Sequence, residues 1–268
     1  MTGIVVTGAS GRMGRALVQS VVESDSVSLI NVTVRSQSPL LGHDASELVG
    51  CKFANAKIVD CLDSTHEKPF VVIDFTTIEA TLEHISWCEE KRVPLVIGTT
   101  GFSKQQEVRI KNASKMIPIV YAPNFSVGIN VVFDLLDRAT RILGDSVDIE
   151  ILEAHHRNKV DAPSGTALAL GKIVSDARGT SLNDVAAYSR VGQIGSRKQG
   201  QLGFATLRAG DIVGEHTVLF AGESERVEIA HKASSRSIFA NGAVRAATWV
   251  SKQKSGLFSM RDVLGLDV

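Results

Sequence analysis

The chain has 268 residues, 44% of them hydrophobic, and its 29 Lys and Arg balance its 29 Asp and Glu. This length can bury one large or two modest apolar cores without a disulfide or a metal ion to hold the fold. A net charge of zero, with no basic run, argues against nucleic acids and acidic membranes as partners. Because no apolar run approaches the ~20 residues that cross a bilayer, and the N-terminus shows no secretory signal pattern, we expect a cytoplasmic protein.

The three cysteines fit neither a redox pair nor a zinc site, because their spacing matches no CxxC motif. They are Cys51, Cys61 and Cys88. We interpret them as reduced thiols in a reducing compartment, and we expect no bound metal.

The N-terminal half alternates short apolar runs with helical patterns. Residues 4–6 form the first run, glycines follow, and apolar residues then recur at helical spacing over 16–22. Further strands are predicted at 27–34, 71–75, 93–97 and 117–121, with a helix at 81–91. Strands that alternate with helices imply right-handed crossovers, so we expect an α/β domain with a Rossmann-type parallel sheet.

The pattern changes beyond about residue 125. A helix is predicted at 129–143, and the strand predicted at 147–154 has one polar face. Later strand candidates follow one another with few helices between them, at 185–191, 203–208, 216–220 and 226–230. This succession predicts a second, α+β domain with a mixed or antiparallel sheet. A last helix is predicted at 237–252, and the pattern alone does not assign it to either domain.

The first apolar run leads into Gly8-x-x-Gly11-x-x-Gly14, a variant of the dinucleotide-binding fingerprint. Glycines let the backbone approach a pyrophosphate, and the following helix offers its N–H groups to it. The spacing by itself fits an ordinary tight turn as well, but here it follows a strand and opens a helix, as a dinucleotide site requires. The residues expected to bind the cofactor at this turn are Gly8, Ala9, Ser10, Gly11, Arg12 and Met13.

The end of the second predicted strand lacks the Asp or Glu that usually binds the ribose hydroxyls of NADH. Val34, Arg35 and Ser36 occupy this place. Arg35 would attract a 2′-phosphate, so we hypothesise that NADPH is preferred over NADH. The alternative is a solvated surface arginine.

Two loops of small or polar residues, 98–102 and 122–126, follow later strands of the predicted sheet. Either loop alone fits a simple turn. Together, at the carboxyl ends of parallel strands, they are typical of the floor under a nicotinamide ring. The residues expected there are Gly98, Thr99, Thr100, Ala122, Pro123, Asn124 and Phe125.

Proton donors and cations are concentrated in the segment 153–166, which includes His155, His156 and Lys159. If the strand continues through this point, the two histidines point to opposite faces, so that one works at the substrate while the other anchors or packs. A metal site is the weaker alternative, because no third ligand stands at a zinc spacing. His216 and His231 lack such neighbours and are expected to be core or surface histidines.

Directly downstream, Pro163 and Ser164 mark a helix start, with Ser164 as the N-cap. The N–H groups of Gly165 and Thr166 would lie at the helix N-terminus, which binds carboxylates and phosphates. With Lys159 or His156 as a second anchor, the segment is suited to a small dianion. A well-capped structural helix beside a charged loop is the alternative.

These residues resemble those of the 4-hydroxy-tetrahydrodipicolinate reductase (dihydrodipicolinate reductase) family, and the resemblance covers essentially the whole chain. It is carried by six motifs, at 8–14, 98–102, 122–128, 153–166, 209–216 and 231–236. The resemblance implies NAD(P)H-dependent reduction of 4-hydroxy-tetrahydrodipicolinate, a small dicarboxylate imine, to tetrahydrodipicolinate in the diaminopimelate route to lysine. Val34 departs from the acidic residue that many members carry for NADH, which puts use of both NADPH and NADH in doubt.

By motif position, the resemblance makes His155 the general acid/base and Lys159 a proton donor. His156 would contact the substrate, and Gly165 and Thr166 would form the carboxylate cradle beside Ser164. The family also implies a dinucleotide-binding domain over 1–126, to which 237–268 returns, and a substrate-binding and tetramerisation domain over 127–236. A homotetramer is therefore expected.

Two other functions are weighed beside this one. A different NADP-dependent dehydrogenase, such as one acting on a semialdehyde, would need a cysteine nucleophile in a suitable loop, and none of the three cysteines lies in one. A non-catalytic dinucleotide sensor would have no use for His155, Lys159 and the 164–166 segment together.

Overall fold

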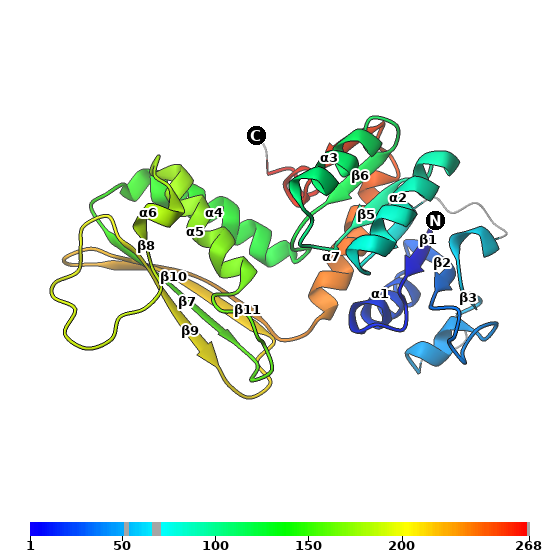
Figure 1. The fold of residues 1–268 in the computed structure, drawn as a ribbon, viewed down its shortest axis with the longest axis horizontal. Helices are drawn as coiled ribbons and strands as arrows, with labels where there is room; N and C mark the ends of the chain where they lie inside the picture. The colour runs from blue at the N-terminus through cyan, green and yellow to red at the C-terminus, as the bar shows by residue number, and fades with distance from the viewer. Residues whose placement is uncertain (51–53, 66–70, 267–268) are drawn as a thin grey trace. The chain divides into compact units, whose positions relative to one another are not determined.

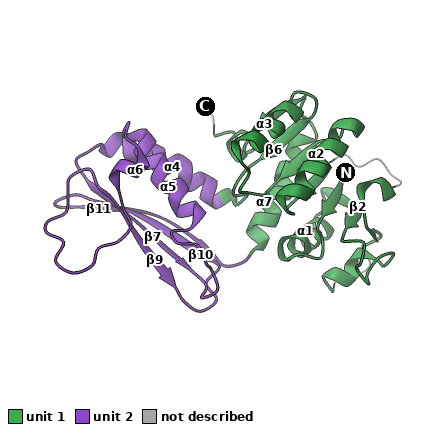
Figure 2. Cartoon of the chain, viewed as in Figure 1, with its two compact units in different colours: residues 1–127, 236–268 green, residues 128–235 purple. Residues whose placement is uncertain are grey.

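The computed structural model describes residues 1–50, 54–65 and 71–266 of the chain. Its contacts divide into two compact units, coloured separately in Figure 2. Unit 1 comprises residues 1–127 and 236–268, and unit 2 comprises residues 128–235. Figure 1 labels helices and strands of both units where there is room.

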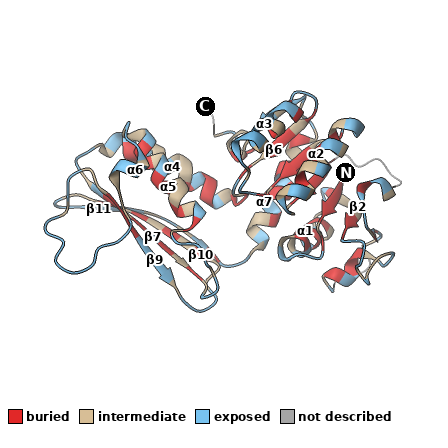
Figure 3. Ribbon diagram, in the orientation of Figure 1, coloured by how far each residue is buried: buried red, intermediate tan, exposed pale blue. Residues whose placement is uncertain are grey.

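Unit 1 is built on a seven-stranded sheet in the order β12-β6-β5-β4-β1-β2-β3, and every neighbouring pair is parallel. The six strands from β3 to β6 follow the order 3-2-1-4-5-6 of dinucleotide-binding folds. Central strands are buried on both faces, which explains their continuous apolar runs (Figure 3). The strands are β1 (Thr2–Thr7), β2 (Val27–Thr33), β3 (Lys57–Val59), β4 (Val71–Asp74), β5 (Leu95–Ile97), β6 (Pro118–Tyr121) and β12 (Gly256–Phe258).

Helices cover both faces of this sheet. Alternate residues of β1 belong to different cores, since Ile4 packs in the cluster that contains α1 and α7 residues, whereas Val5 packs with α2 and α3 residues. Ser20 donates to the Oδ1 atom of Asn241 at 2.7 Å, which ties α1 to the returning α7. The elements are α1 (Arg12–Val22), α2 (Ile78–Lys91), α3 (Lys104–Ala113), α7 (Ser237–Val250), α8 (Met260–Leu264), and the 3-10 turns η1 (Ala45–Leu48) and η2 (Leu62–Ser64).

Unit 2 is a five-stranded mixed sheet in the order β11-β10-β7-β9-β8. β10 is antiparallel to β7 and β11, whereas β9 is parallel to β7 and β8. Ile149 and Ile151 of β7 face the helices, while Leu152 points to the opposite face and is 43% exposed. The elements are α4 (Val127–Leu143), β7 (Asp148–His155), α5 (Gly165–Ala177), α6 (Leu182–Val185), β8 (Ala186–Ala187), β9 (Leu202–Arg208), β10 (Gly214–Ala221) and β11 (Arg226–Ala233).

The parallel sheet followed by a mixed sheet confirms the predicted fold class. The strand expected at 185–191 is wrong in length, because only Ala186 and Ala187 pair with β9 and the chain beyond them forms a long exposed segment. β3, β12 and α3 are absent from the predicted elements, although Ser103 and Gln106 form a capping box at the start of α3. No helix in the described part of the chain combines the length and the apolar composition that a membrane span needs. Cys61 is exposed and Cys88 is buried, both as free thiols, and Cys51 lies outside the described residues.

Candidate functional site

The predicted dinucleotide turn lies between β1 and α1. Gly8 adopts a positive φ of 63°, and Gly11 is the N-cap of α1 without a side-chain hydrogen bond. A Cβ on Gly14 would lie 2.3 Å from the carbonyl oxygen of Gly8 and 2.6 Å from the Cα of Ala9. Only glycine therefore allows the helix to start so close to the strand. The turn presents backbone N–H groups at a helix N-terminus, which fits a pyrophosphate.

A cavity of about 730 Å³ opens beside this turn, beyond the carboxyl ends of β1, β2 and β4. Four of the residues predicted to bind the cofactor line it, namely Gly8, Ser10, Gly11 and Arg35. Ala9 is buried beneath the turn and Arg12 begins α1 at the surface. The wall also contains groups that the sequence analysis missed, namely Thr33, Asp60, Thr76, Glu83 and His84.

The two loops expected under a nicotinamide ring meet at a phenylalanine. Phe75 packs against Phe125 in a tilted arrangement with ring centroids 5.2 Å apart, and a Cβ on Gly98 would lie 2.1 Å from the Phe75 ring. Met13, Gly98, Thr99 and Thr100 line a second cavity, of about 460 Å³, together with Phe75. In the other loop, Ala122 is buried, Pro123 is exposed, and Asn124 accepts a hydrogen bond from the backbone of Ser126 at 2.9 Å.

In unit 2, a buried carboxylate orients the first histidine of the predicted catalytic segment. β7 ends at His155, and Glu153 stands two residues earlier on the same face of the strand. His155 Nδ1 contacts Glu153 Oε2 at 2.6 Å, and both side chains are nearly inaccessible, at 11% and 1% exposure. Because a carboxylate only accepts hydrogen bonds, the proton lies on Nδ1 and Nε2 remains for other chemistry.

Glu153 is in turn held by the neighbouring strand. Arg208 contacts both of its carboxylate oxygens at 2.8 Å in a bidentate pair, and Thr206 donates to Oε1 at 3.2 Å. Burial opposes ionisation, but the hydrogen bonds from Arg208, His155 and the backbone of Ser164 outweigh it and lower the pKa of Glu153 to about 2. Burial lowers the pKa of His155, and Glu153 opposes this change.

Ser164 connects this network to the start of α5. Its backbone N–H donates to Glu153 Oε1 at 3.0 Å, and its side chain caps the helix by accepting from the N–H of Ala167 at 3.1 Å, as predicted. The Ser164 hydroxyl also contacts His216 Nε2 at 2.9 Å. The amides of Gly165 and Thr166 therefore lie in a helical turn anchored directly to the Glu153 carboxylate.

His216, expected to be a core or surface histidine, is buried and also belongs to this site. It lies on β10 with its ring 5.1 Å from that of His155. Burial, assisted by the nearby His155, lowers the pKa of His216 to about 4, so the ring is neutral near pH 7. The antiparallel pairing of Glu153 with His216 brings the two segments together. The motif at 209–216 marks the segment of His216, but it does not indicate this contact.

The remaining predicted residues follow the end of β7. Lys159 Nζ pairs with Asp161 at 2.9 Å, and its side chain is 21% exposed. The strand does not continue through His156, so the expectation that β7 carries both histidines on opposite faces does not hold. The ring atom Nδ1 of His156 is buried and hydrogen-bonds to no group among the described residues.

Comparison with known proteins matches the chain from end to end. The family model "Dihydrodipicolinate reductase, N-terminus" matches residues 2–125, and "Dihydrodipicolinate reductase, C-terminus" matches residues 128–264. A curated 4-hydroxy-tetrahydrodipicolinate reductase from Nitrosospira multiformis is 52% identical over 263 residues, which cover 98% of this chain and 97% of the relative.

Solved structures share the fold at lower identity. A dipicolinate-bound dihydrodipicolinate reductase from Paenisporosarcina sp. TG-14 aligns with a TM-score of 0.77 and 23% identity, over 97% of each chain. A myo-inositol dehydrogenase from Corynebacterium glutamicum aligns with a TM-score of 0.59 and 13% identity, over 100% of this chain and 94% of the other. At these identities the two likenesses show the fold alone.

Proposed function

Because the chain belongs to the dihydrodipicolinate reductase family, we propose that it reduces 4-hydroxy-tetrahydrodipicolinate to tetrahydrodipicolinate in the diaminopimelate route to lysine. Family models over both halves and a relative at 52% identity establish the membership and confirm the resemblance seen in the sequence. A reductase with this fold uses a nicotinamide nucleotide, NADPH or NADH. The substrate is a small cyclic imine with two carboxylates.

The observation that carries this proposal is the oriented His155 beside the anchored start of α5. Glu153 fixes the imidazole through Nδ1, and Ser164 ties the helix start to the same carboxylate. Oxyanions bind at helix N-termini, so the first turn at Gly165 and Thr166 would take one substrate carboxylate. His156 and Lys159 would hold the second.

Conversion of 4-hydroxy-tetrahydrodipicolinate to tetrahydrodipicolinate expels the 4-hydroxyl as water, with a proton from the neighbouring ring carbon. A bound nicotinamide would supply the hydride that reduces the resulting unsaturated imine. Negative charge then builds on the substrate, and a positioned acid must deliver a proton. Lys159 Nζ would deliver it, and His155 Nε2 would act as the general acid/base. The Asp161 carboxylate holds the Lys159 ammonium at 2.9 Å until the substrate carboxylate replaces it.

The cofactor would bind unit 1 along its two cavities. Gly8 to Met13 would hold the pyrophosphate, whereas 98–100 and 122–125 would hold the nicotinamide end. Arg35 lines the larger cavity just after β2, where a 2′-phosphate would lie, so we propose a preference for NADPH over NADH. The kcat/KM for NADPH divided by that for NADH tests this preference. Arg35→Ala should lower this ratio, and an unchanged ratio removes Arg35 from the site.

Unit 2 would also build a homotetramer. One face of its sheet packs on α4 and α5, while Leu152 and Leu207 on the other face are 43% and 53% exposed. Exposed aliphatic side chains on a sheet face favour association with another copy. Sedimentation equilibrium should give four chains per particle, and Leu152→Lys should lower this number.

The decisive experiment is a spectrophotometric assay of NADPH oxidation with freshly generated imine. Lys159→Ala should lower kcat about 100-fold or more, since a positioned proton donor contributes ~100 to 10,000-fold, while the Kd for NADPH changes little. Lys172→Ala is the matched control, because Lys172 makes a similar pair with Asp176 at 2.8 Å on the exposed side of α5. Near-full kcat in Lys159→Ala would defeat the assignment.

The described cysteines give no support to a semialdehyde dehydrogenase. Such an enzyme needs a reactive thiolate beside the substrate site. All three cysteines precede residue 128, outside the unit that contains His155, and burial raises the pKa of Cys88 well above its ordinary value.

A further inference from the structure

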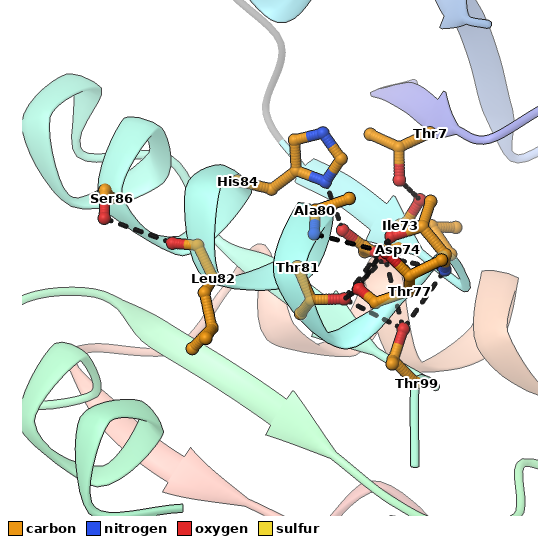
Figure 4. Close-up of polar contacts among 11 residues, drawn as sticks. Thr7, Ile73, Asp74, Thr77, Ala80, Thr81, Leu82, His84, Ser86 and Thr99 are labelled. Atoms are coloured by element: carbon orange, nitrogen blue, oxygen red, sulfur yellow. Dashed lines mark hydrogen bonds and ion pairs between the residues drawn. The ribbon is translucent and has the colours of Figure 1, made fainter. Parts of the chain in front are cut away.

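The carboxylate of Asp74 is fully buried at the carboxyl end of β4, where polar groups surround it (Figure 4). Its Oδ1 atom accepts from the Thr76 backbone at 2.9 Å and from the Thr76 hydroxyl at 2.6 Å. Thr81 and Thr99 donate to the same oxygen at 3.2 and 3.4 Å. A buried carboxylate held by so many fixed donors is a rigid acceptor.

The other oxygen of this carboxylate, Oδ2, contacts His84 Nδ1. Figure 4 shows the His84 ring on α2 with one nitrogen toward Asp74 and the other pointing away from it. Since Asp74 can only accept, Nδ1 carries a proton and Nε2 is the atom left for another partner. His84 also lines the 730 Å³ cavity, with its side chain 19% exposed.

Packing alone does not account for an imidazole here. Oδ1 already accepts from the backbone and the hydroxyl of Thr76, and the hydroxyls of Thr81 and Thr99 lie at 3.2 and 3.4 Å, so α2 and the strand ends are joined without His84. No Lys or Arg in the described ranges pairs with Asp74. An imidazole that joins a rigid buried acceptor to a cavity wall is the arrangement that fixes one ring nitrogen for a ligand.

The place of His84 on the cavity wall indicates which half of a bound dinucleotide it would contact. Thr33 ends β2, Arg35 follows it and Asp60 follows β3, so this cavity extends from the end of β4 across β1 to the β2 side of the sheet. The loop at 98–100 follows β5, on the opposite side of β1, and lines the other cavity. In folds with this strand order the adenosine half lies on the β2 side. The nicotinamide half lies on the other.

We propose that His84 is a cofactor-binding residue whose Nε2 hydrogen-bonds the adenosine half of the dinucleotide, and that Asp74 is the positioning residue that fixes its ring. The proposal rests on the proposed use of a nicotinamide dinucleotide. It assigns to β4 and α2 a second wall of the adenosine site, opposite the Arg35 side. Arg35, Asp60 and Glu83 are the charged groups that share this cavity.

Direct binding tests the contact without turnover. In calorimetric titrations with NADPH and with ADP, His84→Phe should raise both Kd values about tenfold, the loss expected for one hydrogen bond of ~1.4 kcal/mol. The Kd for nicotinamide mononucleotide should stay within twofold. His43→Phe is the matched control, because His43 belongs to the same unit and pairs with Glu47 at 2.9 Å on the surface.

A double-mutant cycle tests the positioning role. Asp74→Asn should weaken ADP binding in the wild-type background but have no further effect in His84→Phe, because it acts through the ring. A merely structural Asp74 would weaken ADP, NADPH and nicotinamide mononucleotide in both backgrounds. If Asp74→Asn does not fold, the His84 variant alone decides the contact.

The outcomes separate this proposal from the proposed function. Unchanged ADP and NADPH affinities in His84→Phe, with normal imine reduction, overturn the His84 contact only. A chain that fails to reduce the imine but loses ADP affinity in His84→Phe keeps the contact and loses the proposed reaction. Equal weakening of all three ligands shows a displaced loop and overturns the contact.

Discussion

The two units use the same device at different strand ends. In unit 1, the buried carboxylate of Asp74 contacts Nδ1 of His84 at the end of β4, and in unit 2, Glu153 contacts Nδ1 of His155 at the end of β7. In each pair the other ring nitrogen is left for a ligand. The common element is a carboxylate that can only accept, which fixes the tautomer and the ring orientation.

The donors that satisfy the two carboxylates differ. Asp74 is held by three threonine side chains and a backbone N–H, whereas Glu153 is bound by the guanidinium of Arg208 in a bidentate pair. A positive partner lowers the pKa of Glu153 to about 2, after burial has raised it. Neutral donors suit a site that holds its ligand in one state. A charged pair suits a site in which a proton moves, because its carboxylate stays ionised while the neighbouring histidine titrates.

The largest effect should come from breaking the charged pair. Glu153→Gln keeps the side-chain volume but presents an amide to His155 Nδ1, which favours the wrong tautomer, and leaves Arg208 without its partner. We expect kcat for imine reduction to fall ~100 to 10,000-fold, as for other lost histidine orienters. The Kd for NADPH should change little, and both are measured by the spectrophotometric assay and calorimetry.

The same strand supplies the control for this variant. Glu150 of β7 is also ion-paired, with Arg190 at 2.7 Å and Arg197 at 3.1 Å, but it contacts no histidine. Glu150→Gln should therefore retain kcat within a few-fold. Similar losses of kcat in both variants would show that β7 tolerates no change, and would remove the orienting role of Glu153.

The site residues that could be predicted from the sequence are those whose role depends on the residue types and spacing of their neighbours in the chain. Glycine spacing after a strand gave the turn at 8–14, and a proline followed by serine gave the N-cap at Ser164, because caps and turns depend on neighbours in the chain. Glu153 was within reach, since positions 153 and 155 of one strand share a face.

What sequence did not give depends on pairing between distant segments. Arg208 reaches Glu153 because β9 pairs in parallel with β7, and His216 arrives through the antiparallel β10. Asp60 lines the 730 Å³ cavity at the end of β3, a strand too short for its own pattern. No hydrophobic periodicity around these side chains indicates a role in the sites. Their positions follow from the pairing register of the strands.

Acid should weaken unit 2 in two steps that follow its buried groups. The pKa of His216 is lowered to about 4 from 6.5, so the folded state binds its proton less readily than the unfolded chain, and stability falls from pH 6.5 to about 4. The pKa of Glu153 is lowered to about 2 from 4.5, so its contribution is lost from pH 4.5 to about 2. Each step amounts to roughly 3 kcal/mol in unfolding free energy.

Urea unfolding followed by far-ultraviolet circular dichroism, at a series of pH values, measures these steps. His216→Gln can still accept from Ser164 but does not titrate, so the decline above pH 4 should shrink. His43→Gln is the control, because His43 is an exposed residue of unit 1 that pairs with Glu47 at 2.9 Å on the surface. A decline above pH 4 that is unchanged in His216→Gln contradicts the assignment.

The smallest effect should distinguish the neutral network from the charged one. Thr81 and Thr206 each donate to their carboxylate at 3.2 Å. Among the described residues, Asp74 has only neutral donors besides His84. Thr81→Val therefore removes a larger part of the hydrogen bonding that offsets burial of this carboxylate than Thr206→Val does for Glu153. It should cost about 2 kcal/mol of unfolding free energy. Thr206→Val should cost about 0.5 kcal/mol, because the bidentate Arg208 still compensates Glu153. Urea unfolding of the two variants measures the difference, and equal losses would mean that the guanidinium gives Glu153 no advantage over the hydroxyls that hold Asp74.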